Sequence, residues 1–167
     1  SPMPRGKAAI ARQWKQMLID REPNEARSAR DWSGIHAKIG TALILVGRPD
    51  EGMTNLQMAV DLAERIVARD PLNGSSQALL IECLHDHAQG AAKVARAPET
   101  APGRRAELWR QTVQSLTRCQ ERLAAPELAR IQFPARKSEK DVKRALAEAR
   151  DALAKISANS ENKAAKP

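Results

Sequence analysis

The residues with the greatest chemical potential lie in one short run, Cys83-Leu84-His85-Asp86-His87. Cys83 and His87 are four residues apart, so on a helix they share a face, and both residue types are common zinc ligands. His85 points elsewhere, and no second Cys/His pair lies nearby to complete the three or four ligands that zinc requires. We therefore expect no metal and no other cofactor, and we interpret Cys83 as a small buried residue beside polar, partly exposed histidines. The other cysteine, Cys119, gives no disulfide framework.

A second chemical possibility is nucleophilic catalysis by Cys83, with His36 or His87 as its base. That arrangement also needs a group that orients the base and donors that stabilise an oxyanion, and the sequence indicates neither. The adjacent carboxylates Asp50 and Glu51 fall at the start of an expected helix, where the helix dipole accounts for them. We expect no catalytic residues and no enzyme activity.

The elements that must position these residues are expected to be helices. The apolar fraction is 42%, yet there is no Tyr, one Phe and three Trp, which we interpret as packing anchors. Helix formers such as Ala, Leu, Arg and Glu dominate, and the β-branched and aromatic runs that favour sheets are missing. The predicted fold class is therefore all-α. No apolar run is long enough to span a bilayer and no signal peptide is visible, so we expect a cytoplasmic protein without a membrane span.

Apolar residues at helical spacing, interrupted by Pro and Gly, divide the chain into about six helices. A turn at 47–50 joins the second helix to the third, and Asp70-Pro71 ends the third. The buried side of the second helix is expected to consist mainly of large apolar residues: Ile35, Ile39, Ala42, Leu43 and Val46. The expected helices cover approximately 5–22, 31–46, 50–69, 75–95, 103–123 and 138–157.

A repeated pattern links these helices. Arg21-Glu22-Pro23 and Arg69-Asp70-Pro71 lie 48 residues apart, and the same offset places Gly40 on Ala88. An offset two residues longer would pair Gly40 with Gly90 instead, and we favour 48. A period of this length is typical of stacked helix pairs, each of which buries its apolar face only against its neighbours.

The unit that contains Gly40, Leu43, Gly47, Ala59 and Pro71 resembles the tetratricopeptide repeat. The resemblance implies a short right-handed superhelix of antiparallel helix hairpins, in which small residues allow the two helices to approach closely. The long second helix is similar to the extended repeats found C-terminal to bacterial serine/threonine kinases and related signalling proteins. No kinase sequence is present, so the resemblance implies a regulatory or scaffolding part and no kinase activity.

This resemblance implies a single helical-repeat domain, 5–157, between a start that we expect to be a cloning remnant (1–4) and a tail that we expect to be disordered (158–167). The expected parts of the domain are a half-repeat helix, two repeats, and a linker with a capping helix: 5–22, 31–71, 75–123 and 126–157. Two positions depart from the family, since Gly52 stands where Ala is usual and His36 where Trp is frequent.

The expected function is non-catalytic protein–protein interaction, with a peptide or partner helix held in a concave groove. The groove is expected to be lined by the first helix of each repeat, through Ala37, Thr41, Ile44, Leu45, Glu82, His85, Gln89 and Lys93. These residues lack the Lys and Asn with which similar repeats hold acidic C-terminal peptides. Packing of Ile44 and Leu45 against a neighbouring helix, with nothing concave left, would contradict this prediction.

The net charge of +8 lies at the two ends of the chain. Residues 1–30 carry 7 Lys and Arg against 3 Asp and Glu, residues 131–167 carry 9 against 5, and residues 31–130 carry 12 of each. The C-terminal basic cluster comprises Arg136, Lys137, Lys140, Lys143 and Arg144. This cluster leaves open a nucleic-acid-binding module, although the interleaved carboxylates favour a solvated face. A second alternative is self-association through the exposed face of the half-repeat around Trp14.

Overall fold

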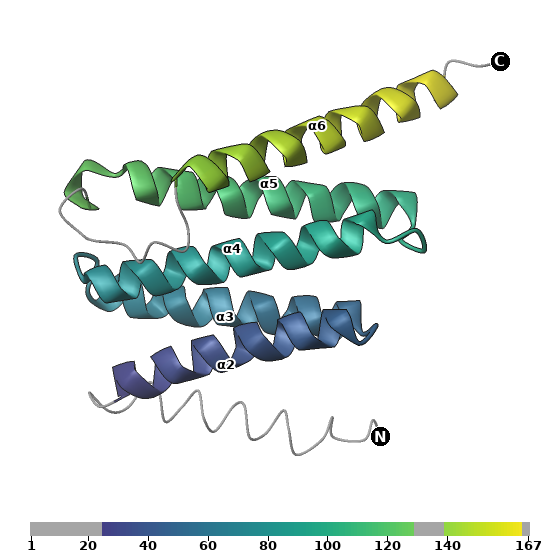
Figure 1. Ribbon diagram of the computed structural model, residues 1–167. Helices are drawn as coiled ribbons and strands as arrows, with labels where there is room; N and C mark the ends of the chain where they lie inside the picture. The colour runs from purple at the N-terminus through teal and green to yellow at the C-terminus, as the bar shows by residue number, and fades with distance from the viewer. Residues whose placement is uncertain (1–24, 129–138, 165–167) are drawn as a thin grey trace, which may run out of the picture.

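Five α-helices follow one another through residues 25–128 and 139–164, the part of the chain that the computed structural model describes (Figure 1). They are α2 (Glu25–Leu45), α3 (Pro49–Arg69), α4 (Gly74–Arg96), α5 (Pro102–Ala124) and α6 (Glu139–Ala164), with a 3-10 turn, η1, at Pro126–Leu128. These ranges contain no strand, so the predicted all-α class is confirmed for them. The predicted half-repeat helix with Trp14, and the basic residues Arg136 and Lys137, lie outside the described residues.

Two helices are longer than the sequence pattern predicted. α2 begins at Glu25 rather than near residue 31, because the intervening stretch contains neither Gly nor Pro and continues the helix. α6 continues to Ala164 instead of ending near residue 157. The helix therefore includes 158–164, the first part of the tail expected from the sequence, which contains neither Gly nor Pro.

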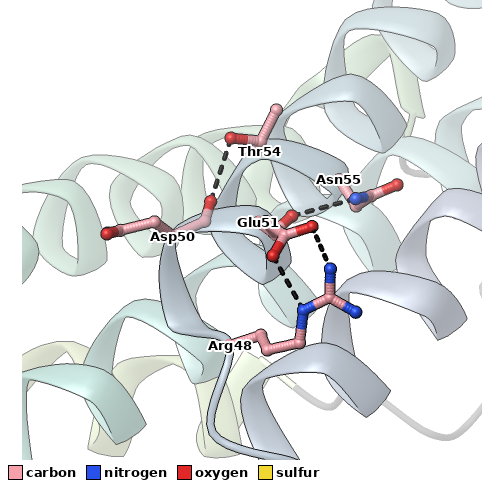
Figure 2. Close-up of polar contacts among 5 residues, drawn as sticks. All are labelled: Arg48, Asp50, Glu51, Thr54 and Asn55. Carbon is pink, nitrogen blue, oxygen red and sulfur yellow. Dashed lines mark hydrogen bonds and ion pairs between the residues drawn. The ribbon is translucent and has the colours of Figure 1, made fainter. Parts of the chain in front are cut away.

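The turn between α2 and α3 forms where it was predicted. Gly47 has a φ of 80°, a left-handed conformation that costs little without a Cβ, and Pro49 occupies the first turn of α3. Arg48 donates two hydrogen bonds to the Glu51 carboxylate, at 2.7 Å from Nε and 2.6 Å from Nη2 (Figure 2). The side chain of Asp50 points away from this pair (Figure 2). The two adjacent carboxylates therefore point in different directions, and each forms an ion pair with a different arginine, Glu51 with Arg48 and Asp50 with Arg104.

The helices lie side by side in chain order (Figure 1), and each contacts the next, while α2 also contacts α4. Ion pairs join Asp50 to Arg104 and Glu64 to Arg118, and both pairs are 54 residues apart in the sequence. Because the separation is the same at both points, α3 and α5 run in the same direction. Parallel equivalent helices are the arrangement expected of stacked helix hairpins.

The α2–α3 pair is held by backbone contact. A Cβ added to Gly40 would lie 2.7 Å from the Gly52 carbonyl oxygen, and one added to Gly52 would lie 2.7 Å from the Gly40 carbonyl oxygen. Ser33 Oγ also donates a 2.8 Å hydrogen bond to the carbonyl oxygen of Ala59. Small residues therefore permit the close approach, as the resemblance implied for Gly40 and Ala59.

This close approach overturns the predicted buried face of α2. Among residues 28–45 of α2, the buried ones are small, namely Ala29, Ser33, Ala37 and Gly40. The predicted core residues Ile35, Ile39 and Val46 are instead 39%, 42% and 70% exposed. A face of large side chains could not come into backbone contact with α3, so the small-residue face is the one that packs.

The core is centred on α4, which lies between α2 and α3 on one side and α5 on the other. Its largest fully buried side chains are contributed by α3, α4 and α5, namely Leu56, Leu80, Leu84, Leu108 and Leu116. Trp32 and Trp109 pack against apolar clusters, as predicted, and the guanidinium of Arg96 lies 5.0 Å from the Trp109 ring centroid. None of the helices within the described ranges is long and apolar enough to cross a membrane.

Candidate functional site

The larger of the two cavities that we describe lies between the parallel helices α3 and α5, with α4 as its floor. Its volume is about 680 Å³, within the size range of ligand-binding clefts. The principal lining residues are Met53, Gln57, Met58, Val60 and Asp61 from α3, His87 from α4, and Arg104, Glu107, Gln111, Gln114, Ser115 and Arg118 from α5. The lining is therefore part apolar and part polar, with methionines that adapt easily to a ligand's shape.

A second cavity of about 420 Å³ lies next to the larger one, towards the C-terminal ends of α3 and α5. It is lined by Val67 of α3, Leu72 of the following turn, Gln77 of α4, Arg122 of α5 and Leu128 of η1, among others. Arg118 lines both cavities, so they adjoin one another. We call the two cavities together the α3–α5 groove.

Two ion pairs cross this groove. Arg104 Nη2 lies 3.3 Å from Asp50 Oδ1 at one end, and Arg118 pairs with Glu64 further along. The pairs are 14 residues apart on each helix, or about four turns, which corresponds to about 21 Å along the helix axes. All four side chains are at least one-third exposed, so the pairs span the groove with little contribution to stability.

His87 forms the floor of the larger cavity. Its side chain is buried, and its Nδ1 lies 3.0 Å from Ser115 Oγ. Burial lowers the pKa of His87 below its ordinary value of 6.5, and the carboxylate of Asp61 partly opposes that shift. The imidazole is therefore neutral at neutral pH and presents a polar but uncharged surface.

The carboxylates of the larger cavity have different partners. Glu107 accepts hydrogen bonds from Gln111 at 3.2 Å and Arg110 at 2.9 Å, and these bonds lower the pKa of Glu107. Asp61 accepts a 2.7 Å hydrogen bond from the neutral amide of Gln57. The negative charge of Glu107 is thus partly neutralised by an arginine, whereas the partner that we find for Asp61 is uncharged.

At the far end of the groove, Arg122 is hydrogen-bonded to the side-chain amide of Gln77, which is itself hydrogen-bonded to the backbone. Arg122 Nη1 donates a 2.8 Å hydrogen bond to Gln77 Oε1, and Gln77 Nε2 donates a 2.6 Å bond to the Pro71 carbonyl oxygen. Burial, together with the positive charge of Arg118, lowers the pKa of Arg122. This chain of contacts connects the beginning of α4 to the end of α5.

Cys83 and His87 belong to different interfaces of α4. Cys83 Sγ lies 3.1 Å from Ser33 Oγ of α2, whereas His87 is paired with Ser115 of α5. Burial raises the pKa of Cys83 to about 11, with partial relief from Ser33, so the thiol stays protonated and is a poor nucleophile at neutral pH. His36 Nδ1 lies 2.9 Å from Asn55 Oδ1.

The predicted burial of Cys83 is confirmed, but the prediction of partly exposed histidines was wrong for His87, which is buried because α5 covers it. His85 is half-buried. Within the described ranges, no group of three or more His, Cys, Asp or Glu side chains could hold a metal ion.

The predicted groove residues on α2 and α4 do not line either of the two cavities. Ala37 is buried, and Ile44 is partly buried and packs against α3 beside Gly52, so neither offers a free side chain. Leu45 is 63% exposed. Thr41, Glu82, Gln89 and Lys93 are exposed and His85 is half-buried, so a contact surface on this face stays a prediction.

The basic residues of α6 are exposed, but carboxylates of the same helix accompany them. Lys143 Nζ lies 2.5 Å from Glu139, and Arg144 Nη2 lies 3.2 Å from Asp141. Lys140 is exposed on the same turns. The described part of the basic cluster is therefore a charge-mixed, solvated face rather than a continuous positive stripe.

The groove predicted from the sequence is on the first helices of the repeats, whereas the two cavities lie between the second helices, α3 and α5. The sequence did contain a sign of this groove, because Asp50 and Arg104, and likewise Glu64 and Arg118, are an acidic and a basic residue separated by 54 positions.

No family model matches the chain, and no curated protein or solved structure matches it.

Proposed function

We propose that this chain is a non-catalytic protein-interaction module of tetratricopeptide-like type, and that a segment of a partner lies in the α3–α5 groove. The observation that carries the proposal is the groove itself, which follows two parallel helices and is lined by both apolar and polar side chains. The resemblance of the sequence to the extended repeats of bacterial signalling proteins is a separate support. It also motivates the proposal that the module regulates a larger protein.

The dimensions of the groove suit a peptide. About 21 Å separates the two ion pairs, and an extended chain advances about 3.3 Å per residue, so this stretch accommodates about six residues. The side-chain amides of Gln57, Gln111 and Gln114 can donate to and accept from a peptide backbone, and Met53 and Met58 can cover apolar side chains. Such a mixture supports moderate affinity and some sequence preference.

Selection from a displayed library of random twelve-residue peptides tests this proposal. We expect the chain to enrich a related set of peptides whose binding is lost in Met58→Arg, which places a long charged side chain in the larger cavity. The matched variant Gln89→Arg, on the exposed face of α4, should bind as the unmodified chain does. Enriched peptides that bind both variants equally would contradict the assignment to this groove, and no enrichment at all would contradict the function.

Nucleic-acid binding and self-association are the other predicted functions. The ion pairs of Lys143 and Arg144 with carboxylates of α6 give no support to the first. The second was predicted for the segment around Trp14, which lies outside the described residues. We therefore propose neither function.

A further inference from the structure

The carboxylates that line the larger cavity are not equally compensated. Three carboxylates line the larger cavity, and two of them contact a guanidinium: Asp50 is paired with Arg104 and Glu107 with Arg110. Glu64, which pairs with Arg118 across the groove, is likewise compensated. Asp61 also lines the groove, and the hydrogen bond that it accepts comes from the neutral amide of Gln57. Within the described ranges, Asp61 takes part in no ion pair of this kind.

Asp61 also lies at the solvent-exposed edge of the larger cavity, where a ligand can reach it. It lies between the two ion pairs that cross the groove, and it is close enough to the floor for its charge to act on His87. Its side chain is exposed, whereas Val60 beside it is buried and Met58 is half-buried. A negative charge is therefore presented at the edge of a partly apolar cavity, next to an uncharged imidazole.

We infer that the α3–α5 groove takes a lysine or arginine side chain of the partner segment, with the cationic head at Asp61 and the aliphatic stem against Met53 and Met58. This inference rests on the proposed function and specifies the chemistry of the partner. Long cationic side chains place their methylene groups on apolar surface while the charge stays at a polar edge, and the cavity offers both surfaces. The partner's cation would give Asp61 the kind of contact that Asp50 and Glu107, the other two carboxylates of the larger cavity, obtain within the chain.

An acidic partner residue at the same place is disfavoured. It would face the carboxylates of both Asp61 and Glu107. The two arginines that line this cavity, Arg104 and Arg118, are already paired with carboxylates and would not compensate it. An uncharged residue would fit the cavity but would leave Asp61 with the Gln57 amide alone. Charge complementarity therefore selects a cation, even though the chain as a whole carries a net charge of +8.

Two small probes test the inference directly. Nα-acetyl-arginine amide carries the cation, and Nα-acetyl-citrulline amide has nearly the same shape without the charge. Each is titrated into isotopically labelled chain while the backbone amide signals of Gln57 and Asp61 are followed by NMR. We expect saturable shifts with the arginine probe and about fivefold weaker binding of the citrulline probe, the upper end of what an exposed ion pair contributes.

Asp61→Asn should weaken the arginine probe about fivefold, to the level of the citrulline probe. Asp31→Asn is the matched control, because Asp31 is an exposed carboxylate of α2 that does not line the groove. Equal affinity for the two probes, no effect of Asp61→Asn, or no binding of either probe would each overturn the inference. An unchanged thermal unfolding midpoint of Asp61→Asn confirms that the variant is folded.

The outcome separates this inference from the proposed function. Library peptides that bind the groove without a basic residue would overturn the role of Asp61 and leave the proposed function intact. Library peptides that ignore Met58→Arg would contradict the groove itself, and with it both proposals.

Discussion

Helix α3 has two sides that are built differently. Towards α2 it is in backbone contact, with Gly40 and Gly52 each where a Cβ would collide with the other's carbonyl oxygen. Towards α5 it presents long side chains such as Met58, and the two helices flank a cavity of about 680 Å³. Residue size thus determines which interface is closed and which forms a groove.

The comparison also separates stability from binding. The closed side buries small residues and the protonated Cys83 thiol, and its role is to hold the first hairpin together. The open side combines surface ion pairs, which add little to stability, with a buried neutral histidine. Substitutions on the two sides should therefore have different consequences.

The largest expected effect comes from closing the space between α2 and α3. Gly52→Ala and Gly40→Ala should each destabilise the chain by about 1–3 kcal/mol, because the added methyl group meets backbone that cannot move aside. Gly34→Ala is the matched control in α2, the helix of Gly40, because a Cβ at Gly34 meets nothing within 4 Å, and it should stabilise by up to about 1 kcal/mol. Urea unfolding measures all three, and equal effects at the three sites would refute the close contact.

The next effect concerns Cys83 at high pH. Its pKa rises from 9.0 in the unfolded chain to about 11 in the folded one, so the unfolded state loses its proton first. Stability should fall as pH rises from 9 to 11, by about 2 kcal/mol in total. Cys83→Ala should have a flatter curve over this interval, and the chain contains no Tyr to confuse the measurement. Identical curves would show that the thiol is not buried as described.

On the groove side, His87 should make the chain sensitive to mild acid. Its pKa is lowered by folding, so below pH 6.5 the unfolded state binds a proton that the folded state does not. Stability should therefore be complete above pH 6.5 and decrease as pH falls below it. His87→Gln, which can still hydrogen-bond to Ser115, should remove this part of the dependence. A ring signal of His87 that titrates by NMR at or above pH 6.5 would contradict the assignment.

The smallest expected effect comes from the ion pairs that cross the groove. Arg104→Gln should change the free energy of unfolding by about 0.2–1 kcal/mol, since both partners are substantially exposed. Arg110→Gln, whose pair with Glu107 lies within α5, provides a comparison of similar exposure. A loss above about 2 kcal/mol in Arg104→Gln alone would mean that the ion pair holds α3 and α5 together.

Much of the fold could be predicted from the sequence, because Pro and Gly mark the helix ends and Gly40 marks the close contact. The buried face of α2 could not, because periodicity favours large apolar residues such as Ile35 whereas the interface required small ones. The burial of His87 depends on its neighbour Ser115, which is 28 residues away in the sequence. The α3–α5 groove could not be predicted either, because it also depends on contacts between distant parts of the sequence: α3 and α5 are separated in the chain by α4.

The central claim is that a partner binds between α3 and α5 rather than on the exposed face of α2 and α4. The most direct measurement is the NMR footprint of a library-selected peptide on the labelled chain. We predict that the amide signals of Asp61 and Ser115 shift with the peptide while those of Thr41 and Gln89 stay in place. Shifts confined to Thr41 and Gln89 would contradict the claim and return the binding site to the first helices of the repeats.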